Sequence, residues 1–409
     1  MKDIKKVTRI VAAVLTVAFL GFVFVAFGVM ITRNGGDLVE SVSRMSELKA
    51  YLPENWNALD LLQARISSLT AATAEHMWLK DEMGYINSGF QYALGKQMIN
   101  TGNQNMIRLN TGHFYDLQSY KSLEDSAADI IELKDTILKD TPFLFVYEHP
   151  TLYDQSMMPT GYESLDHSKE MADEVVTALT EGGVEVLDSR DVLMNSGYSL
   201  EDLLMYTDQH WSTLSALTMA QSIAETLKEM TGAEIDPTLL DMDQMNTQVH
   251  ENLFMGKYGQ RVGTGVVEPD DIVEYWPKYE TNISRHTKQT VSIQDVSGSF
   301  REVAIRAERL EPDEGKTWNK LAYTYYGQVE AYDIYTNESA PDITIFLLKD
   351  SYSAPIAPFL SLIARNVVSL DLRRDIPPLS EWMEQYEPDV VVMAYSLQML
   401  RDDEYDFGD

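Results

Sequence analysis

The chain has 409 residues, of which 44% are hydrophobic and 10% aromatic, so it is long and apolar enough to fold around a sizeable core. Its formal net charge of −32, with no basic stripe to reverse it locally, opposes phosphate backbones and argues against a nucleic-acid partner. The absence of cysteine excludes disulfides, thiolate nucleophiles and thiolate metal sites.

The N-terminus carries an apolar run that is long enough to cross a membrane. Residues 10–32, "IVAAVLTVAFLGFVFVAFGVMIT", are uncharged, and at ~1.5 Å per residue they cover a hydrocarbon core of ~30 Å. Lysines and an arginine precede the run and an acidic chain follows it, which predicts a cytoplasmic N-terminus. A cleaved signal peptide is the alternative, but the run is longer than a usual signal core and no A-x-A site closes it. We expect residues 1–36 to be a cytoplasmic N-terminus and a single-pass anchor in the cell membrane, with the remainder extracellular.

Residues 37–120 are expected to form a helical stalk that leads into the main domain. Two glycines make residues 33–41 a short flexible exit from the membrane. Between residues 56 and 99, apolar side chains recur at steps of three and four residues, which is the period of one helix face.

From residue 121 to residue 400 the sequence alternates between helix and strand patterns. Helices are expected at 126–140, 169–183 and 212–230, with strands at 142–150 and 184–190. The runs "ITIFLL" and "DVVVMAY" near the C-terminus are continuously apolar, as strands of a parallel sheet buried on both faces must be. We therefore expect an α/β domain with three layers, α/β/α, around a mostly parallel sheet. Residues 231–340 are irregular and rich in Thr, Val, Tyr and Gly, which predicts a β-rich insertion, and residues 401–409 form an acidic tail.

Ser351 in "LLKDSYSAP" is the candidate nucleophile. The preceding strand ends at Leu348, so Ser351 lies at the carboxyl edge of the sheet, where open α/β sheets place their sites. The start of the following helix is expected close by, where it can stabilise negative charge. The alternative interpretation is structural, with Ser351 as a helix cap and Asp350 as a turn residue.

The stretch "YTDQHWS", residues 206–212, supplies the groups that a serine nucleophile needs. Asp208 and His210 are two residues apart in an extended segment and point to the same side, so His210 can act as the base and Asp208 can orient its ring. Trp211 can wall the site, and Ser212 is expected to cap the next helix. The other histidines have no comparable neighbour: His76, His113, His149, His167, His250 and His286.

Metal binding is the competing explanation for an Asp-x-His pair. No second histidine stands at ligand spacing, and "DMDQMNTQVHE" at 241–251 lacks the glycine and acidic spacing of a calcium loop. We expect no metal and no cofactor.

Four motifs together carry a family resemblance. They are, in order, "TDQHWS", "FMGKYGQRVG", "FLLKDSYSAPIAPFLSLIARNVVSLDLRR" and "EPDVVVMAYS". Over residues 120–400 the chain resembles the SGNH-hydrolase-like domain of the alginate O-acetyltransferase group, and especially the DHHW family of Gram-positive bacteria. The resemblance implies an SGNH-like fold with Ser351 as nucleophile, His210 as base and Asp208 as its orienting carboxylate, with the Asp-x-His element before the serine, the reverse of the order in ordinary SGNH esterases.

The resemblance also suggests oxyanion- or substrate-binding residues. Arg373 matches the family's Asp-x-Arg segment, and the further candidates are Gln260, Tyr258, Trp211, Lys349, Gly259 and the backbone N–H of Ser351. Two positions depart from the pattern. Gln209 stands at the second of the four signature positions, and Lys349 replaces the glycine that precedes Asp-Ser in ordinary SGNH enzymes, although DHHW relatives tolerate lysine there.

The resemblance implies a membrane-anchored extracellular O-acetyltransferase that forms an acetyl-serine intermediate. The expected acceptor is a cell-surface or secreted polysaccharide, and the expected partner is a membrane-bound O-acyltransferase that supplies acetyl groups. Two alternatives remain open at the sequence level. The same side chains could serve a carbohydrate acetyl-esterase, or the fold could form a non-catalytic glycan-binding or assembly subunit of an acetylation complex.

Overall fold

The computed structural model describes Gly21, Val25 and residues 80–100, 105–288, 293–327 and 331–402. The chain divides into two compact units, residues 1–87 and 88–409. Among the described residues, no helix is both long and apolar enough to span a bilayer. Apart from Gly21 and Val25, the predicted anchor at 10–32 lies outside the described residues, as do most of the predicted stalk and the acidic tail from residue 403.

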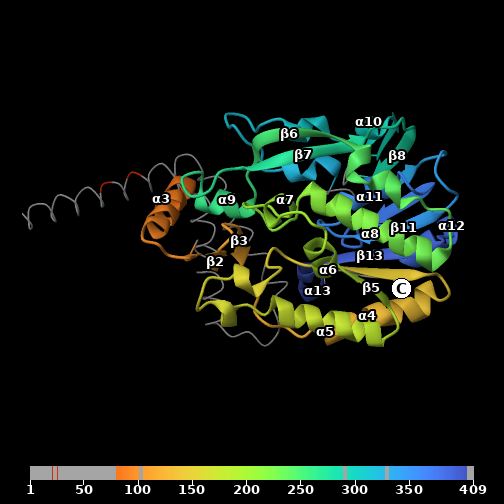
Figure 1. Ribbon diagram of the computed structural model, residues 1–409, viewed down its shortest axis with the longest axis horizontal. Coiled ribbons are helices and arrows are strands. Elements are labelled where there is room, and N and C mark those ends of the chain that lie inside the picture. Colours follow the sequence, from red (N-terminus) through yellow and green to blue (C-terminus); the bar gives the residue numbers. More distant parts are fainter. Residues whose placement is uncertain are drawn as a thin grey trace, which may run out of the picture. The chain divides into compact units, whose positions relative to one another are not determined.

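A large mixed β-sheet organises the second unit (Figure 1). Within the described residues it has eight strands in the order β5-β4-β13-β11-β12-β10-β8-β9. The first five run parallel, and the last three continue the sheet in antiparallel pairing. The bounds in that order are Glu185–Asp188, Phe143–Glu148, Val390–Ser396, Thr344–Lys349, Asn366–Leu370, Tyr332–Thr336, Ile283–Lys288 and Ile293–Gly298.

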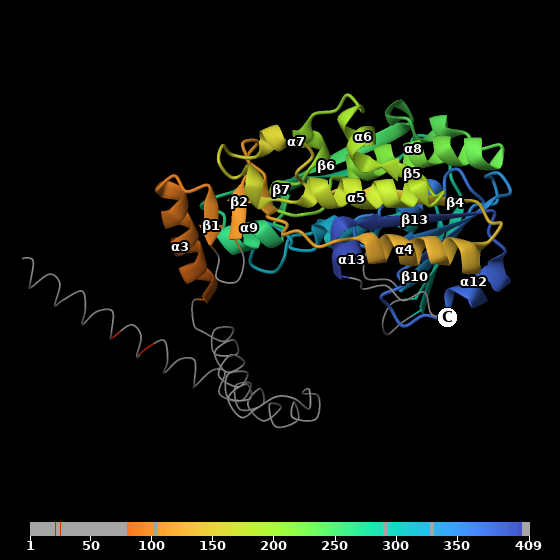
Figure 2. The ribbon, with the colours of Figure 1, turned by 90° about the horizontal axis from the view of Figure 1, so that it is seen from below.

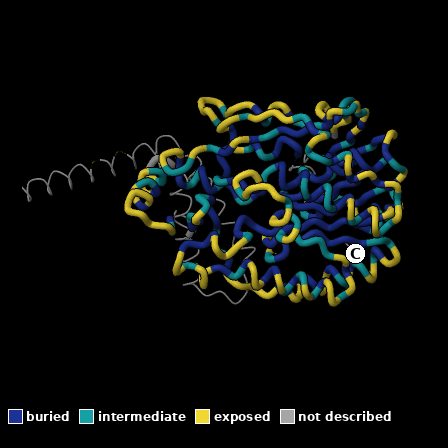
Figure 3. Tube along the Cα trace, in the orientation of Figure 1, coloured by how far each residue is buried: buried dark blue, intermediate teal, exposed yellow. Residues whose placement is uncertain are grey.

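Helices cover both faces of this sheet, so it is the middle of three layers (Figures 1 and 2). Alternate side chains of β4 enter different cores: Leu144 and Val146 face one, and Phe145 and Tyr147 face the other. The helices that pack on the Leu144 face are α6 (Ser189–Met194), α8 (Thr213–Thr231), α10 (Phe300–Ala304) and α11 (Ile356–Leu360). Those on the Phe145 face are α4 (Glu124–Leu133), α5 (Ser168–Glu181), α12 (Leu379–Tyr386) and α13 (Leu397–Asp402). This double coverage explains why the central parallel strands are mostly apolar, and they are dark blue in Figure 3.

The segment 231–340, expected to be rich in β-structure, divides into two parts. Strands β6 (Met245–Phe254) and β7 (Asp270–Pro277) pair as an antiparallel ribbon, while β8, β9 and β10 extend the main sheet. A short helix, α9 (Lys257–Val262), follows β6. The segment is therefore continuous with the main core.

Part of the segment 37–120 forms strands that the sequence pattern did not predict. After α3 (Lys80–Ala93), the strands β1 (Met98–Asn100), β2 (Asn105–Arg108) and β3 (Phe114–Asp116) make a small antiparallel sheet. Its apolar side chains pack with Tyr258 and Val262 of α9. This sheet supports α9, whose first residues contact the candidate site.

Candidate active site

The first arm of the candidate site is the turn that follows β11. Asp350 is buried, and its carboxylate accepts hydrogen bonds from the backbone N–H groups of Tyr352 (2.8 Å) and Ser396 (2.9 Å). Ser353 Oγ accepts from the N–H of Asp350 (3.1 Å) and donates to the carbonyl of Ala394 (3.0 Å). The turn that carries Ser351 is thus tied to the end of β13 at the carboxyl edge of the sheet.

The expected helix start beside Ser351 is not found. Helix α11 begins at Ile356, with Pro355 as its N-cap residue, so Ser351 lies outside the first helical turn. The physical reason is that the side chains of Asp350 and Ser353 bind the backbone of this turn instead of capping a helix. Ser212, in contrast, caps α8 as predicted, because its hydroxyl accepts the N–H of Ser215 at 3.3 Å.

The second arm is residues 206–212, and Thr207 is its anchor. The Thr207 carbonyl accepts the N–H groups of Tyr258 (2.9 Å) and Gly259 (3.0 Å) at the start of α9. Buried Asp270 accepts the N–H groups of Tyr206 (2.6 Å) and Thr207 (2.9 Å) and also the Thr207 hydroxyl. The carbonyl, the N–H and the hydroxyl of Thr207 are all hydrogen-bonded. Asp208, the next residue, is therefore held in a fixed position.

Gly256 allows the two segments to approach each other this closely. A Cβ atom at this position would lie 2.6 Å from the Thr207 carbonyl oxygen and 2.5 Å from Asp208 Oδ2, and it would overlap the Cβ of Asp208. The φ angle of Gly256 is −70°, which any residue can adopt, so space and not backbone conformation requires glycine here.

A chain of hydrogen bonds joins the two arms, although 141 residues separate His210 from Ser351. His210 Nε2 lies 2.9 Å from Ser351 Oγ, and His210 Nδ1 lies 2.5 Å from Asp208 Oδ1. The second carboxylate oxygen of Asp208 accepts the backbone N–H of Lys257 at 2.7 Å. The structure therefore brings together the three residues that the sequence selected.

The charge on Asp208 decides which nitrogen of His210 faces the serine. Burial alone would raise the pKa of Asp208, but the charge and hydrogen bond of His210, with the N–H groups of Lys257 and His210, lower this pKa below its ordinary value. The ionised carboxylate accepts a hydrogen bond from His210 Nδ1–H. The lone pair of Nε2 then faces the Ser351 hydroxyl. This arrangement can accept the serine proton as the oxygen attacks an electrophile.

Aromatic rings enclose His210. Its ring stacks on Tyr323 at 4.5 Å between centroids and also contacts Tyr352 at 4.7 Å. Trp211 Nε1 donates to the Tyr352 carbonyl at 2.9 Å, so Trp211 supports the wall of the site. The crevice at Ser351 has a volume of about 10 Å³, which is room for one water-sized group.

The described lining of this crevice includes none of Arg373, Gln260, Tyr258 and Lys349. Arg373 makes two hydrogen bonds of 2.8 Å to buried Asp371, and Gln260 donates to the Met255 carbonyl. Tyr258 is part of the small core under α9, and Lys349 is buried at the end of β11. Gly259 already donates its N–H to Thr207.

Among the candidate oxyanion donors, the N–H of Ser351 has no acceptor in the part of the chain that the structure describes.

Sequence reasoning missed several residues that build the site. Tyr323 gives no signal in the sequence, because it belongs to a short 3₁₀ turn more than a hundred residues from His210. Gly256 and Lys257 lie in the motif "FMGKYGQRVG", but their contacts with Asp208 depend on the packing of α9 against residues 206–212. For Asp350 the sequence indicates only a turn residue. It gives no signal for Glu148, which is buried at the end of β4.

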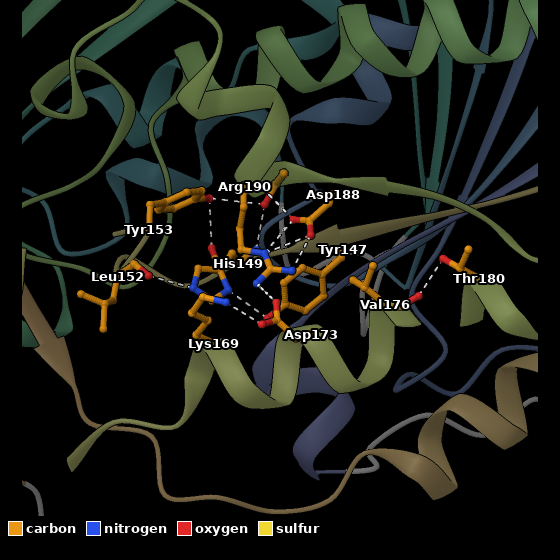
Figure 4. A network of polar contacts seen from close by, with 11 residues as sticks. Tyr147, His149, Leu152, Tyr153, Lys169, Asp173, Val176, Thr180, Asp188 and Arg190 are labelled. Carbon is orange, nitrogen blue, oxygen red and sulfur yellow. Dashed lines mark hydrogen bonds and ion pairs between the residues drawn. The ribbon is translucent and has the colours of Figure 1, made fainter. Parts of the chain in front are cut away.

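A separate polar network lies where β4 and β5 end (Figure 4). Arg190 makes a two-pronged ion pair with Asp188 and a further pair with Asp173, which also binds Lys169. His149 contacts the Tyr147 hydroxyl at 3.0 Å and the Leu152 carbonyl at 2.8 Å, and burial lowers its pKa to about 3, so it stays neutral. These groups satisfy one another beside a cavity of about 400 Å³. The network holds α5 and α6 to the sheet.

Comparison with known proteins agrees with the motifs. Residues 143–297 match the family model described as "SGNH hydrolase-like domain, acetyltransferase AlgX". The resemblance predicted from the four motifs is confirmed. The chain contains an SGNH-like α/β fold with a large mixed sheet. No relative is found among curated protein sequences.

Solved structures show the same fold. A DHHW family protein from Eubacterium siraeum is 16% identical with a TM-score of 0.57, over 75% of this chain and 94% of that one. Bacillus cereus PatB1 with a sulfonyl adduct is also 16% identical, with a TM-score of 0.61 over 76% of this chain and 100% of that one. Another PatB1 structure is 17% identical, with a TM-score of 0.59 over 75% and 100% of the two chains.

Proposed function

We propose that this protein is an O-acetyltransferase that moves an acetyl group to a hydroxyl of a polysaccharide through Ser351. The hydrogen-bond chain from Ser351 through His210 to Asp208 is the observation that carries the proposal. The matched family model is described as an acetyltransferase, which favours transfer as the reaction type. The esterase alternative uses the same side chains, with water in place of the sugar hydroxyl.

The reaction has two half-reactions, and His210 accepts and returns the proton in both. Ser351 Oγ attacks the acetyl carbonyl carbon while its proton passes to His210 Nε2, and the backbone N–H of Ser351 stabilises the oxyanion. The intermediate expels the donor oxygen, which takes the proton from His210, and acetyl-Ser351 remains. A sugar hydroxyl then attacks this ester and gives its proton to His210, and the serine oxygen leaves with that proton. Asp208 stabilises the imidazolium in both half-reactions.

Packed side chains surround the position of the acyl group on Ser351. The crevice there is lined by Trp211, Tyr323, Tyr352 and Pro355, among others.

The compartment is part of the proposal. The apolar run at 10–32 would hold the enzyme in the cell membrane with its catalytic domain outside. Since acetyl-CoA is cytoplasmic, an extracellular site needs a partner that carries acetyl groups across the membrane. We propose a membrane-bound O-acyltransferase in that role.

Mass spectrometry of the full chain in detergent tests the proposed nucleophile. Wild type, Ser351→Ala, His210→Ala and the control Ser339→Ala, which changes an exposed serine, are incubated with a reactive acetyl ester and, separately, with a sulfonyl fluoride. We expect an added mass on the Ser351 peptide in wild type and in the control only. An equal adduct in Ser351→Ala would refute the assignment. With an oligosaccharide acceptor present, acetate release without acetylated sugar would favour the esterase.

A further inference from the structure

Glu148, the last residue of β4, is a fully buried carboxyl group that the proposed reaction does not use. Its exposed fraction is 0%, and neither of its carboxylate oxygens has a donor among the described residues. An isolated ionised carboxylate is very costly to bury, and a native fold normally neutralises or pairs such a group. The position of Glu148 therefore requires an explanation.

The neighbour of Glu148 is Asp350, the residue that precedes Ser351. Glu148 pairs with Ser396 in the parallel ladder between β4 and β13, and the N–H of Ser396 donates to Asp350 Oδ2. The two carboxyl groups therefore lie side by side at the carboxyl edge of the sheet. Burial, followed by the charge of Asp350, raises the pKa of Glu148 well above its ordinary value.

The donors around Asp350 decide which carboxyl group holds the proton. Asp350 accepts two backbone N–H groups, those of Tyr352 and Ser396. Among the described residues, Glu148 has no such donors, and no cation contributes to its pKa shift. The protonated form is therefore favoured at Glu148.

We propose that Glu148 is a protonated acid that donates a hydrogen bond to Asp350, and that this shared proton holds the Ser351 turn in position. Glu148 is in this sense a positioning residue, and its role rests on the proposed function of Ser351. If Glu148 loses the proton, two buried carboxylates repel each other. The bonds from Asp350 to Tyr352 and Ser396 then weaken, and Ser351 shifts away from His210.

The proposal predicts an alkaline loss of activity that depends on Glu148. Glu148→Gln keeps a neutral donor next to Asp350, so we expect it to retain ester turnover within about threefold and to remove the alkaline limb. Glu148→Ala removes the donor and should lose about 10- to 100-fold in kcat/KM, as a misplaced nucleophile does. Glu185→Gln, which changes an exposed glutamate on β5, is the matched control and should behave as wild type.

Infrared spectroscopy observes the proton directly. The full chain, labelled with ¹³C at glutamate carboxyl groups, should show the C=O stretch of a protonated glutamic acid at pH 8, and this band should be absent in Glu148→Gln. The absence of the band in wild type would overturn the proposal, as would an alkaline limb that is the same in wild type and Glu148→Gln.

The band is also measured in Ser351→Ala, where it should persist. If Ser351→Ala keeps full turnover, the proposed function fails, and the band still decides whether Glu148 and Asp350 share a proton.

Discussion

Replacing Gly256 by alanine should disable the candidate site without an unfavourable backbone angle. The added methyl group would lie 2.5 Å from Asp208 Oδ2 and 2.6 Å from the Thr207 carbonyl oxygen, whereas ordinary contacts begin at 3.4 Å. Because the overlap with the Cβ of Asp208 is larger still, Asp208 must move by about 1.1 Å relative to α9. A displacement of this size at a catalytic group costs ~100-fold in rate, or about 2.7 kcal/mol of transition-state stabilisation. Overpacking should also lower the free energy of unfolding by about 1–3 kcal/mol.

The assay for Gly256→Ala is kcat/KM for a chromogenic acetyl ester together with thermal unfolding. Gly265→Ala is the matched control, because a Cβ there meets no atom within 4 Å, and it should keep wild-type activity and stability. If Gly256→Ala stays folded and within twofold of wild type in kcat/KM, the reasoning that links the approach of α9 to the position of Asp208 is wrong.

Three further predictions concern single side chains. Asp208→Asn should lower kcat by ~10⁴-fold with little change in KM, measured with the same ester, because the amide no longer selects the productive tautomer of His210. Tyr323→Leu should lower kcat by about 2- to 30-fold because the imidazolium loses a stacked ring, and Tyr323→Phe should restore most of the rate. Burial raises the pKa of Asp270 to about 7, above its unfolded value of ~3.9, so its contribution to stability is complete below pH ~4 and is lost as the pH rises through 7. Denaturant titrations should therefore show that Asp270→Asn gains stability relative to wild type by up to ~1.4 kcal/mol per pH unit between these values, whereas a constant difference would contradict the shift.

The sequence predicted the central layers because buried parallel strands leave a strong signal. The runs that became β11 and β13 are apolar except at their ends, which are Thr344 and Lys349 in β11 and Ser396 in β13, as expected for strands covered on both faces. The small sheet β1–β3 gave no such signal, because strands of three or four residues are too short to display a period. Helix α11 begins at Ile356 and not beside Ser351, and its N-cap residue is Pro355, whose ring fixes the φ angle.

The site was predictable where chemistry depends on local spacing. Asp208 and His210 are two residues apart, and Ser351 directly follows a strand and a carboxylate, so a short window reveals them. The surroundings were not predictable in this way. Tyr323 reaches His210 only after the chain has folded, and Arg373, a plausible anion binder by motif, is engaged by Asp371. Side chains that complete a pocket are selected by tertiary packing, which leaves no periodic pattern in one sequence.

The two arms of the site are held by different parts of the fold, and this separation explains the order of its residues along the chain. The Ser351 turn is fixed to the end of β13 through Asp350 and Ser353, whereas Asp208 and His210 are fixed to α9 and to Asp270 at the start of β7. Apart from the hydrogen bond from Trp211 Nε1 to the Tyr352 carbonyl, each arm is anchored outside the other, so the geometry requires only that both meet at one edge of the sheet. An Asp-x-His element can therefore precede its serine by 141 residues and still present the same atoms to it. It also follows that Gly256→Ala and Glu148→Ala, although they disturb different arms, should both weaken the hydrogen bond between His210 and Ser351.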